Sequence, residues 1–475
     1  MFVMKKGLLC ALALVSILFA SCDGEALFKK VHFPDLSEPP GSYDHALRVS
    51  INNSHTGVEY RYTLDGTAPN AKSPIESGGI VIDGDHATTF LKVIGIAPGW
   101  ISSDMAEAEY TLDFTGGMDP SFSPPGVWDG TFISAVHLQA DGKAIIIGGF
   151  QEFANAERGR IARLGSDGSL DAGFPSGGSG ADGDIYAVAV QPDGRLVIGG
   201  YFDTYNGTSR GHVARLESDG SLDAGFRAAG QGAYGPVEAL CIQEDGKVLL
   251  GGKFTSFDGT ERGRVARLNT DGSLDDGFLS TGAGADGAVC AIGVQSNGKI
   301  VIGGSFTHYN GAERSHIARL NADGSLDTGF AASTDYDVYS LLILSDDSLL
   351  IGGDFTTCNG EARGHIAKLG ANGVLDNAFL SSGAGANNRV SSITVLSDGK
   401  ILIAGDFTAC QSMVRERVAR LLSDGSMDTS FHPFGSGANA LVYDAAVQAD
   451  GMPIIAGAFH QYGGEYAMGI VRLMN

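Results

Sequence analysis

The chain has 475 residues, a formal net charge of −23 at pH 7 and 43% hydrophobic residues. Such an acidic chain cannot neutralise a run of phosphates, which excludes nucleic acid as a partner. Its 70 glycines against 14 prolines, without a low-complexity tract, favour turn positions in an all-β protein over disorder.

Residues 1–21 are predicted to be a secretion signal. A basic start is followed by an apolar stretch, residues 7–20, that is too short for a membrane span. The stretch ends in Leu18-Phe19-Ala20-Ser21-Cys22, which resembles the lipobox of bacterial lipoproteins, with phenylalanine where leucine is common. The resemblance implies a lipid on Cys22, a tether over 22–30, and anchoring in the bacterial cell envelope, either periplasmic or surface-exposed. The alternative is an ordinary cleaved signal, which would also export the chain.

Short runs of alternating apolar and polar residues over 31–113 predict a small β-sandwich. The cluster Asp65-Gly66-Thr67 is expected to be a tight hairpin in which the Asp65 side chain bonds the turn backbone. The words Tyr62-Thr-Leu-Asp65-Gly66-Thr67-Ala-Pro69 and Gly99-Trp-Ile-Ser-Ser103 resemble the immunoglobulin-like domain at the C-terminus of chitobiases. That domain is an accessory module, so the resemblance assigns no catalytic role to Asp65.

One motif is repeated seven times over 116–475. The second glycine of each Gly-Gly or Ala-Gly pair marks the copies, with steps of 51, 52, 52, 49, 52 and 52 residues between Gly149, Gly200, Gly252, Gly304, Gly353, Gly405 and Gly457. This period, filled with short apolar runs and Asp-Gly turns, is typical of β-propeller blades. Each copy offers four strand candidates, which in the second copy are 185–190, 195–202, 212–216 and 222–226. The turn at Asp346-Asp347 lacks glycine and is expected to be strained.

The last copy ends at Asn475 without its Asp-Gly-Ser-Leu-Asp-x-x-Phe segment, and the missing piece occurs upstream, at 117–122. Because an open sheet edge leaves backbone groups unpaired, this displacement predicts a closed ring. The expected fold is therefore all-β, an immunoglobulin-like sandwich followed by a closed seven-bladed β-propeller. Repeat words such as Gln191-Pro-Asp-Gly-Arg-Leu-Val-Ile-Gly-Gly200 resemble the bacterial delta-60 β-propeller repeats, a resemblance that implies an exported setting and no shared chemistry.

Two periodic sets of opposite charge run through the repeats. In the basic set, which starts at Arg163, the alternation of side chains along a strand places each residue on the same face as an apolar neighbour. That face lies between blades, where a buried charge needs a partner. We expect Arg–Asp pairs that act as structural clasps, with ligand binding as the alternative. The pairs are Arg163–Asp171, Arg215–Asp223 and their copies, and Arg472–Asp119 across the closure.

A second set of arginines precedes the third strand of each repeat. Cations gathered on one rim could hold anionic groups such as sugar acids or partner carboxylates. The alternative is that they bond loop carbonyls and nearby acids. The set comprises Arg158, Arg210, Arg262, Arg314, Arg363 and Arg415, and beside it run Arg160, His212, Arg264, His316, His365 and Arg417.

No motif predicts a cofactor or a metal. Asp167-Gly-Ser-Leu-Asp171 lacks the further oxygen ligands of a calcium loop, so an Asp-capped turn explains it better. Cys241, Cys290, Cys358 and Cys410 have neither disulfide nor metal spacing, and the last two are expected to fill space as small apolar groups. Nucleophile elbows and phosphate-binding loops are absent from the sequence.

These observations favour a monomeric, non-enzymatic binding or scaffold module for a protein or glycan partner. The alternative is a carbohydrate-active enzyme, a glycoside hydrolase or polysaccharide lyase, with its site at the propeller axis. An acid or histidine present in one blade only and aimed at the axis would favour the enzyme. A structural coat component is the third possibility.

Overall fold

The computed structural model describes residues 29–43, 47–82, 88–112, 116–126, 131–175, 178–227, 230–381, 385–431 and 437–475. The predicted secretion signal and Cys22 lie outside these residues. The chain divides into two compact units, residues 1–113 and 114–475. Every regular element in the described ranges is a β-strand, and none of these ranges holds a helix long and apolar enough to cross a bilayer.

The first unit is a β-sandwich. One sheet has the order β1 (Gly41–Tyr43), β6 (Ala106–Leu112), β5 (Thr88–Ile96) and β3 (Glu59–Thr63), and β1 runs parallel to β6. The other sheet pairs β2 (Leu47–Val49) with β4 (Ile80–Ile82). Alternate side chains of β6 are buried, which is the pattern of a sheet that covers a core on one face. The predicted immunoglobulin-like sandwich is confirmed.

The turn at Asp65 forms, but the tight hairpin predicted there is wrong. Asp65 Oδ1 accepts hydrogen bonds from the Thr67 amide at 2.9 Å and the Thr67 hydroxyl at 2.6 Å, and these bonds hold the pKa of Asp65 below its usual value. However, β3 pairs with β5, and β4 pairs with β2. The chain folds back on β3 only after a longer loop, where Ile75 bridges Arg61 antiparallel, and then continues into β4 of the other sheet.

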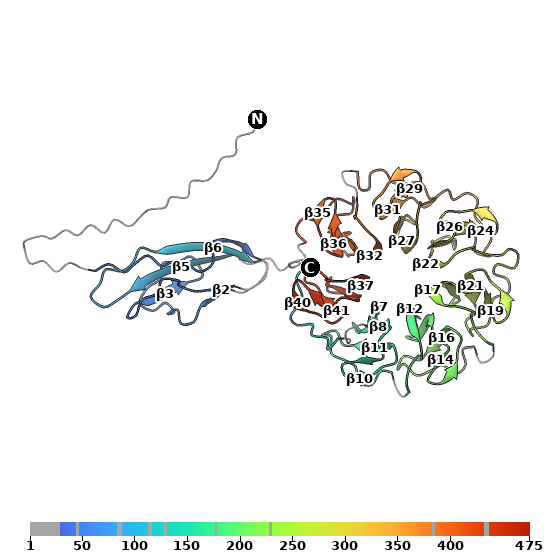
Figure 1. Ribbon diagram of the computed structural model, residues 1–475, viewed down its shortest axis with the longest axis horizontal. Helices are drawn as coiled ribbons and strands as arrows, with labels where there is room; N and C mark the ends of the chain where they lie inside the picture. Colours follow the sequence, from blue (N-terminus) through green and yellow to red (C-terminus); the bar gives the residue numbers. More distant parts are fainter. Residues whose placement is uncertain are drawn as a thin grey trace, which may run out of the picture. The chain divides into compact units, whose positions relative to one another are not determined.

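The second unit repeats one blade seven times around a centre (Figure 1). The innermost strands are β7 (Ile133–Leu138), β12 (Asp184–Val190), β17 (Val237–Ile242), β22 (Val289–Val294), β27 (Val338–Ile343), β32 (Val390–Val395) and β37 (Val442–Val447). The middle strands are β8 (Ala144–Gly148), β13 (Leu196–Tyr201), β18 (Val248–Gly252), β23 (Ile300–Gly304), β28 (Leu349–Gly353), β33 (Ile401–Gly405) and β38 (Pro453–Gly457). The third strands are β11 (Ile161–Leu164), β16 (Val213–Leu216), β21 (Val265–Leu268), β26 (Ile317–Leu320), β31 (Ile366–Leu369), β36 (Val418–Leu421) and β41 (Ile470–Arg472).

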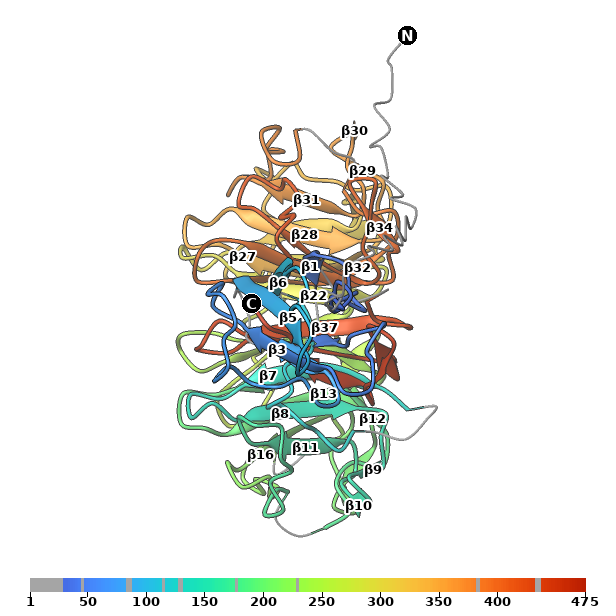
Figure 2. The ribbon, with the colours of Figure 1, turned by 90° about the vertical axis from the view of Figure 1, so that its left-hand side faces the viewer.

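Between its middle and third strands, each blade carries a short outer hairpin. The hairpins are β9 (Glu152–Phe153) with β10 (Ala156–Glu157), β14 (Thr204–Tyr205) with β15 (Thr208–Ser209), β19 (Ser256–Phe257) with β20 (Thr260–Glu261), β24 (His308–Tyr309) with β25 (Ala312–Glu313), β29 (Thr357–Cys358) with β30 (Glu361–Ala362), β34 (Ala409–Cys410) with β35 (Met413–Val414), and β39 (Gln461–Tyr462) with β40 (Glu465–Tyr466). Figure 2 shows blade strands such as β8 and β28 running across the thickness of the propeller, with hairpins toward one side. We call this side the hairpin face. The innermost strands begin there, and their first residues pair with the last residues of the middle strands.

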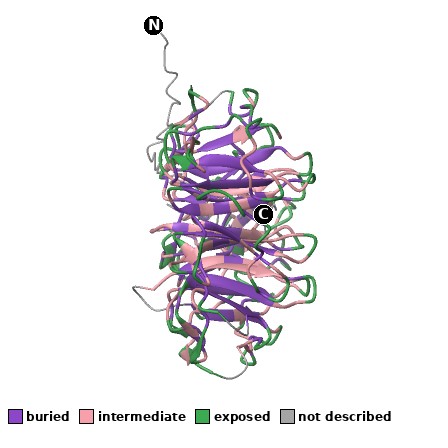
Figure 3. Cartoon of the chain, turned by 90° about the vertical axis from the view of Figure 1, so that its right-hand side faces the viewer, coloured by how far each residue is buried: buried purple, intermediate pink, exposed green. Residues whose placement is uncertain are grey.

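The core lies between blades. Nearly all middle-strand residues are buried, as expected for a sheet packed between two neighbours. Figure 3 shows the buried residues following the strands and the exposed ones gathered in the loops. Neighbouring innermost strands contact one another, β37 with β7 included, so the first and last blades are adjacent.

The predicted fourth strand of each blade is reduced to one bridge. In the second blade only Leu222 pairs with the third strand, at Leu216. The chain then bends because Asp223 Oδ1 accepts the Gly225 amide at 2.8 Å, a local turn that competes with further strand pairing.

The upstream segment lies against the last strand, as predicted. Met118 pairs antiparallel with Leu473, and the Asp119 amide donates to the Arg472 carbonyl at 2.8 Å. The Met474 amide donates to the Gly117 carbonyl at 2.9 Å. The segment therefore supplies the bridge that the last repeat lacks, and the ring closes without an open edge.

The second glycine of each pair is required by a β-bulge. In all seven blades the innermost strand carries one extra residue opposite this glycine. A Cβ at Gly200 would lie 2.1 Å from the Asp184 carbonyl oxygen, and one at Gly148 would lie 2.1 Å from the Phe132 oxygen. The marker of the first blade is therefore Gly148, not Gly149, and the first step becomes 52 residues. The turn that lacks glycine places Asp347 at φ 63°, the strained conformation that was expected.

Candidate functional site

The Arg–Asp sets meet as charge pairs in every blade. Arg163 Nε lies 2.9 Å from Asp171 Oδ2, Arg215 Nε lies 2.8 Å from Asp223 Oδ2, and Arg472 Nε lies 2.7 Å from Asp119 Oδ2. The same pair forms at Arg267–Asp275, Arg319–Asp327 and Arg420–Asp428, and Lys368 replaces arginine at 3.7 Å from Asp376.

Each clasp arginine also links its blade to the next one. Arg215 Nη1 donates to the Thr270 carbonyl at 2.6 Å, and Arg472 Nη1 donates to the Ser166 carbonyl at 2.8 Å. Its guanidinium covers the aromatic ring that ends the repeat, at 4.4 Å from the Phe226 centroid in the second blade. Because Nε and Nη1 of these arginines bond protein oxygens, the contacts fit a structural clasp.

The second arginine set lies near the hairpin face but does not project freely from it. Each member donates Nη1 to the carbonyl of the preceding residue, for example Arg314 to Glu313 and Arg363 to Ala362. The Nε atoms of all six are buried without a partner. Burial lowers the pKa of Arg210 and of Arg415. These contacts fit the alternative, bonds to loop carbonyls, and the anion-binding rim stays a prediction.

The residues beside that set share one backbone conformation. Arg160, His212, Arg264, His316, His365 and Arg417 all have φ between 60° and 70°, and Gly469 takes the same place in the last blade at 79°. All of these side chains except His212 bond nearby carbonyls: for example, Arg264 Nη1 donates to Ala285 at 3.1 Å, and His365 Nδ1 lies 3.1 Å from the Gly353 oxygen. These bonds help to offset the cost of a left-handed conformation in residues other than glycine.

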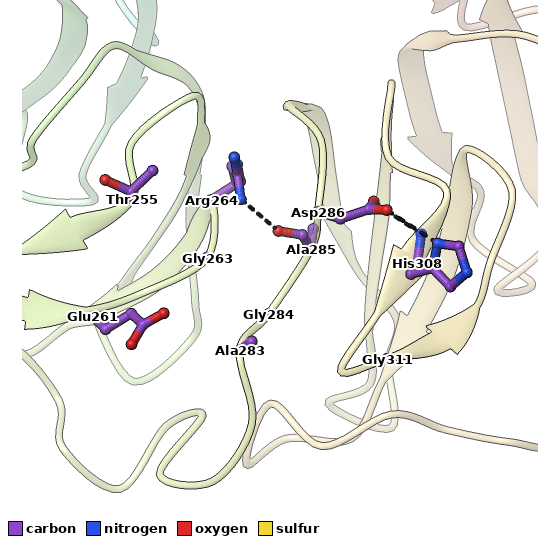
Figure 4. Close-up of a pocket in the computed structure, with 10 residues that line it drawn as sticks. All are labelled: Thr255, Glu261, Gly263, Arg264, Ala283, Gly284, Ala285, Asp286, His308 and Gly311. Carbon is purple, nitrogen blue, oxygen red and sulfur yellow. Dashed lines mark hydrogen bonds and ion pairs between the residues drawn. The ribbon is translucent and has the colours of Figure 1, made fainter.

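A cavity of about 370 Å³ lies between the third and fourth blades (Figure 4). Asp286 and His308 point toward each other on one side, with His308 Nδ1 3.0 Å from Asp286 Oδ2, and Arg264 and Glu261 lie across the cavity. Although burial acts to raise it, bonds from the His308 amide and from Thr307 hold the pKa of Asp286 well below its usual value.

The Asp286 arrangement is structural, because other blades repeat it without the histidine. Asp182 accepts the Thr204 amide at 2.9 Å and the Thr204 hydroxyl at 3.0 Å in the second blade. Asp335 accepts the same two groups from Thr356 in the fifth blade. The aspartate caps the loop that follows the middle strand, and His308 adds one contact to an existing cap.

A second cavity, of about 440 Å³, lies between the fourth and fifth blades and includes Arg314. Its lining also contains one acid, Glu313, and is otherwise small or apolar: Ser315, Phe330, Ala331, Ala332 and Ser333. No second blade contributes a matching acid and base pair to it among the residues that the structure describes.

Two acids and one histidine occur on the innermost strands of single blades: Glu238 on β17, Asp444 on β37 and His137 on β7. Glu238 is neutralised by Lys253, whose Nζ lies 2.6 Å from its Oε1. Asp444 is partly buried: it accepts the Val136 amide of the first blade at 3.0 Å and the Ser392 hydroxyl of the sixth blade at 2.8 Å, and desolvation raises its pKa. Burial also lowers the pKa of His137. The sequence analysis did not single out these residues, although each breaks its repeat column.

The turn aspartates bond their own turns, and the cysteines carry free thiols. Asp167 Oδ1 accepts the Ser169 amide at 3.0 Å and the Ser169 hydroxyl at 2.6 Å, which is the capped turn expected in place of a calcium loop. Across the described ranges, no three His, Cys, Asp or Glu side chains gather in a way that could hold a metal ion. The four cysteines of these ranges carry free thiols, and Cys358 and Cys410 are fully buried.

The chain is thus a seven-bladed β-propeller built from near-identical repeats and preceded by an immunoglobulin-like domain. It belongs to the family described as a domain of unknown function (DUF5122) β-propeller, whose model matches residues 139–174, 191–226, 243–278, 295–330, 344–379, 396–431 and 448–475. The chitobiase/β-hexosaminidase C-terminal domain matches residues 38–113. Both resemblances inferred from the repeat words and from the Asp65 region are confirmed.

Solved structures of low sequence identity resemble parts of the chain. The WD40 β-propeller domain of Doa1 is 14% identical with a TM-score of 0.49, over 75% of this chain and 97% of that one. The extracellular domain of a putative one-component system from B. thetaiotaomicron is 13% identical with a TM-score of 0.45, and this chain covers 40% of it. PorZ, a surface component of the type-IX secretion system of Porphyromonas gingivalis, is 12% identical with a TM-score of 0.43, over 90% of this chain and 60% of that one. A search of curated proteins finds none that matches.

Proposed function

We propose that the chain is an exported, lipid-anchored binding module, without catalytic activity, whose propeller holds a glycan or a protein partner. One observation carries the proposal: two carboxylates near the starts of innermost strands lie in ion pairs. Glu238 is held by Lys253 and Asp354 by Arg389, which donates Nη2 to Asp354 at 2.7 Å. Paired charges can orient a ligand, whereas acid–base catalysis needs a group that is free to give or take a proton.

The rival, a carbohydrate-active enzyme, needs two carboxyl groups on either side of a glycosidic bond. The single-blade acids nearest to that requirement are Glu238 and Asp444. Asp444 accepts hydrogen bonds from an amide and a hydroxyl of the two neighbouring blades. A substrate would have to displace both bonds to reach it, so these two residues support binding better than hydrolysis.

Anchoring and export remain part of the proposal because they depend on the first 22 residues. The expected outcome is that the mature chain begins at Cys22 with an acyl group and fractionates with membranes. Replacing Cys22 by serine should release the chain into the soluble fraction. Unchanged membrane association of the Cys22→Ser chain would contradict the anchor while leaving the binding role intact.

The binding role is tested with the chain from residue 22 onward carrying Cys22→Ser, on a glycan array and, in parallel, on a panel of polysaccharides assayed for released products. The proposal predicts retention of at least one glycan or protein ligand without product release. Turnover that is lost in Glu238→Gln would favour the enzyme instead.

A further inference from the structure

The blades differ from one another mainly at one end of their innermost strands. The bulge residue that faces the conserved glycine is Ser134, Tyr186, Glu238, Cys290, Tyr339, Ser391 or Tyr443, although the residue before it is always a fully buried valine or isoleucine. The fold therefore requires the bulge but not the identity of its side chain. These positions all lie near the hairpin face, and their side chains can differ from blade to blade without loss of the fold.

The bulge side chains of the third and fourth blades contact each other across the blade boundary. Cys290 Sγ lies 3.5 Å from Glu238 Oε2, whose other oxygen pairs with Lys253. The pKa of Tyr186 is raised mainly by burial, and to a smaller extent by the nearby carboxylates of Asp184 and Glu238. Three consecutive blades thus place an aromatic ring, a carboxylate, an ammonium group and a thiol together.

The fifth and sixth blades continue the same cluster with the same chemistry. Arg389, at the start of β32, donates Nε and Nη2 to the two oxygens of Asp354 at 2.9 and 2.7 Å. Its guanidinium also covers the Tyr339 ring at 4.4 Å, and Tyr339 donates its hydroxyl to Asp337 at 3.0 Å. Asp337 also lies 3.4 Å from His316 Nδ1 of the fourth blade, so the cluster crosses the boundary between the fourth and fifth blades.

Exposed aromatic rings stand beside this cluster. Tyr201, which pairs with Asp184 at the start of β12, is 60% exposed and stacks on His212 at 5.7 Å. Tyr234 and Tyr336 are 78% and 61% exposed, in the segments that lead into β17 and β27. We call Tyr186, Tyr201, Glu238, Lys253, Tyr339 and Arg389 the axial belt.

The charge pattern of the axial belt favours an uncharged ligand over a charged one. The two ion pairs at the axial belt, Glu238–Lys253 and Asp354–Arg389, are already neutral, so a charged ligand that used either one would have to separate it. A hydroxyl group can donate to a paired carboxylate and accept from a paired ammonium or guanidinium group at the same time. Tyrosine rings offer apolar faces with a polar edge, as polar ligands with apolar faces require.

We propose that the axial belt binds an uncharged oligosaccharide, with sugar rings against its tyrosines and hydroxyl groups on the Glu238–Lys253 and Asp354–Arg389 pairs. This inference rests on the proposed binding function and assigns its surface and its ligand class.

The test uses the chain from residue 22 onward with Cys22→Ser, and compares neutral oligosaccharides, uronic-acid oligosaccharides and lysine-rich peptides by calorimetric titration. Tyr201→Ala and Lys253→Met are the belt variants. Tyr466→Ala is the matched control, because Tyr466 is a similarly exposed tyrosine on an outer hairpin. Unchanged melting temperatures establish that the variants fold.

The proposal predicts that neutral oligosaccharides bind, that each belt variant weakens binding about tenfold or more, and that Tyr466→Ala has no effect. Binding of neutral sugars that both belt variants retain would overturn the assigned surface but not the binding function. Preference for the acidic oligosaccharide or the basic peptide would overturn the ligand class. Failure of every glycan and protein probe to bind would overturn the proposed function itself.

Discussion

Arg472 donates Nε to Asp119 at 2.7 Å, although 353 residues of chain separate them. The pair joins the last strand to a segment that precedes the first blade. Both side chains are less than a tenth exposed, and Ser121 Oγ accepts a further bond from Arg472 Nη2 at 2.9 Å. The clasp is therefore the polar part of the closure, and the Met118–Leu473 bridge is its backbone part.

Replacing Asp119 by alanine should lower the free energy of unfolding by about 3–5 kcal/mol, because it leaves a buried guanidinium without its carboxylate. Asp376→Ala is the matched control: its partner Lys368 lies 3.7 Å away and both side chains are partly exposed, so the loss should be much smaller. Chemical unfolding measures both. An Asp119→Ala chain as stable as the parent would contradict the clasp.

Tyr462→Phe should cost about 1 kcal/mol, because it removes a hydroxyl that donates to the Gly116 carbonyl at 2.8 Å. Tyr205→Phe is the internal control, since Tyr205 makes the same bond to Gly220 within one blade at 2.8 Å. Similar losses in the two variants are expected from thermal unfolding. A loss confined to Tyr205→Phe would mean that the closing segment does not occupy the place of a blade segment.

Gly200→Ala should destabilise the chain by about 3 kcal/mol, because the new Cβ would meet the Asp184 carbonyl oxygen. Gly199→Ala should cost far less, since its Cβ meets a Val237 methyl group and alanine already occupies this column at Ala404 and Ala456. Denaturant midpoints distinguish them. Equal tolerance at the two positions would contradict the bulge as the reason for the invariant glycine.

Asp327 and Asp444 should give opposite pH profiles. Lys299 and Arg319 hold the pKa of Asp327 at about 2, below its unfolded value of 3.8, so its carboxylate stabilises the fold at neutral pH and loses this effect as pH falls through that window. Burial raises the pKa of Asp444, so its contribution is fully present below pH 3.8 and declines as pH rises through the folded pKa.

The measurement is the free energy of unfolding of Asp327→Asn and Asp444→Asn relative to the parent, at pH 3 and pH 7. The deficit of Asp327→Asn should be larger at pH 7, and Asp444→Asn should gain on the parent between pH 3 and pH 7. Parallel profiles for the two variants would rule out the assigned shifts.

Much of the fold can be predicted from the sequence because the same motif occurs seven times, so each structural position can be compared across seven copies. The Asp-Gly turns, the clasp pairs and the displaced 117–122 segment were all visible as columns. The fourth strand was overestimated because the Asp223 side chain bends the chain after a single bridge. The first-blade marker was placed at Gly149 because a bulge has no signal in a single repeat.

The axial belt escaped the sequence analysis for a related reason. Residues that recur in every copy, such as Arg163 and Arg158 and their equivalents, are visible in the sequence as candidate sites. In the structure they bond within and between blades. Glu238 and Tyr339 are seen only when the copies are compared for what they do not share. That comparison needs the register of the bulge, which the backbone pairing supplies.

The closure is tested most directly by hydrogen exchange of the amides at the two ends of the propeller. The Asp119 amide donates to Arg472 and the Met474 amide donates to Gly117, so both should exchange as slowly as amides of β38 and in the same cooperative step. Rapid exchange over 116–122 while β38 and β41 stay protected would show that the ring is sealed in another way or not at all.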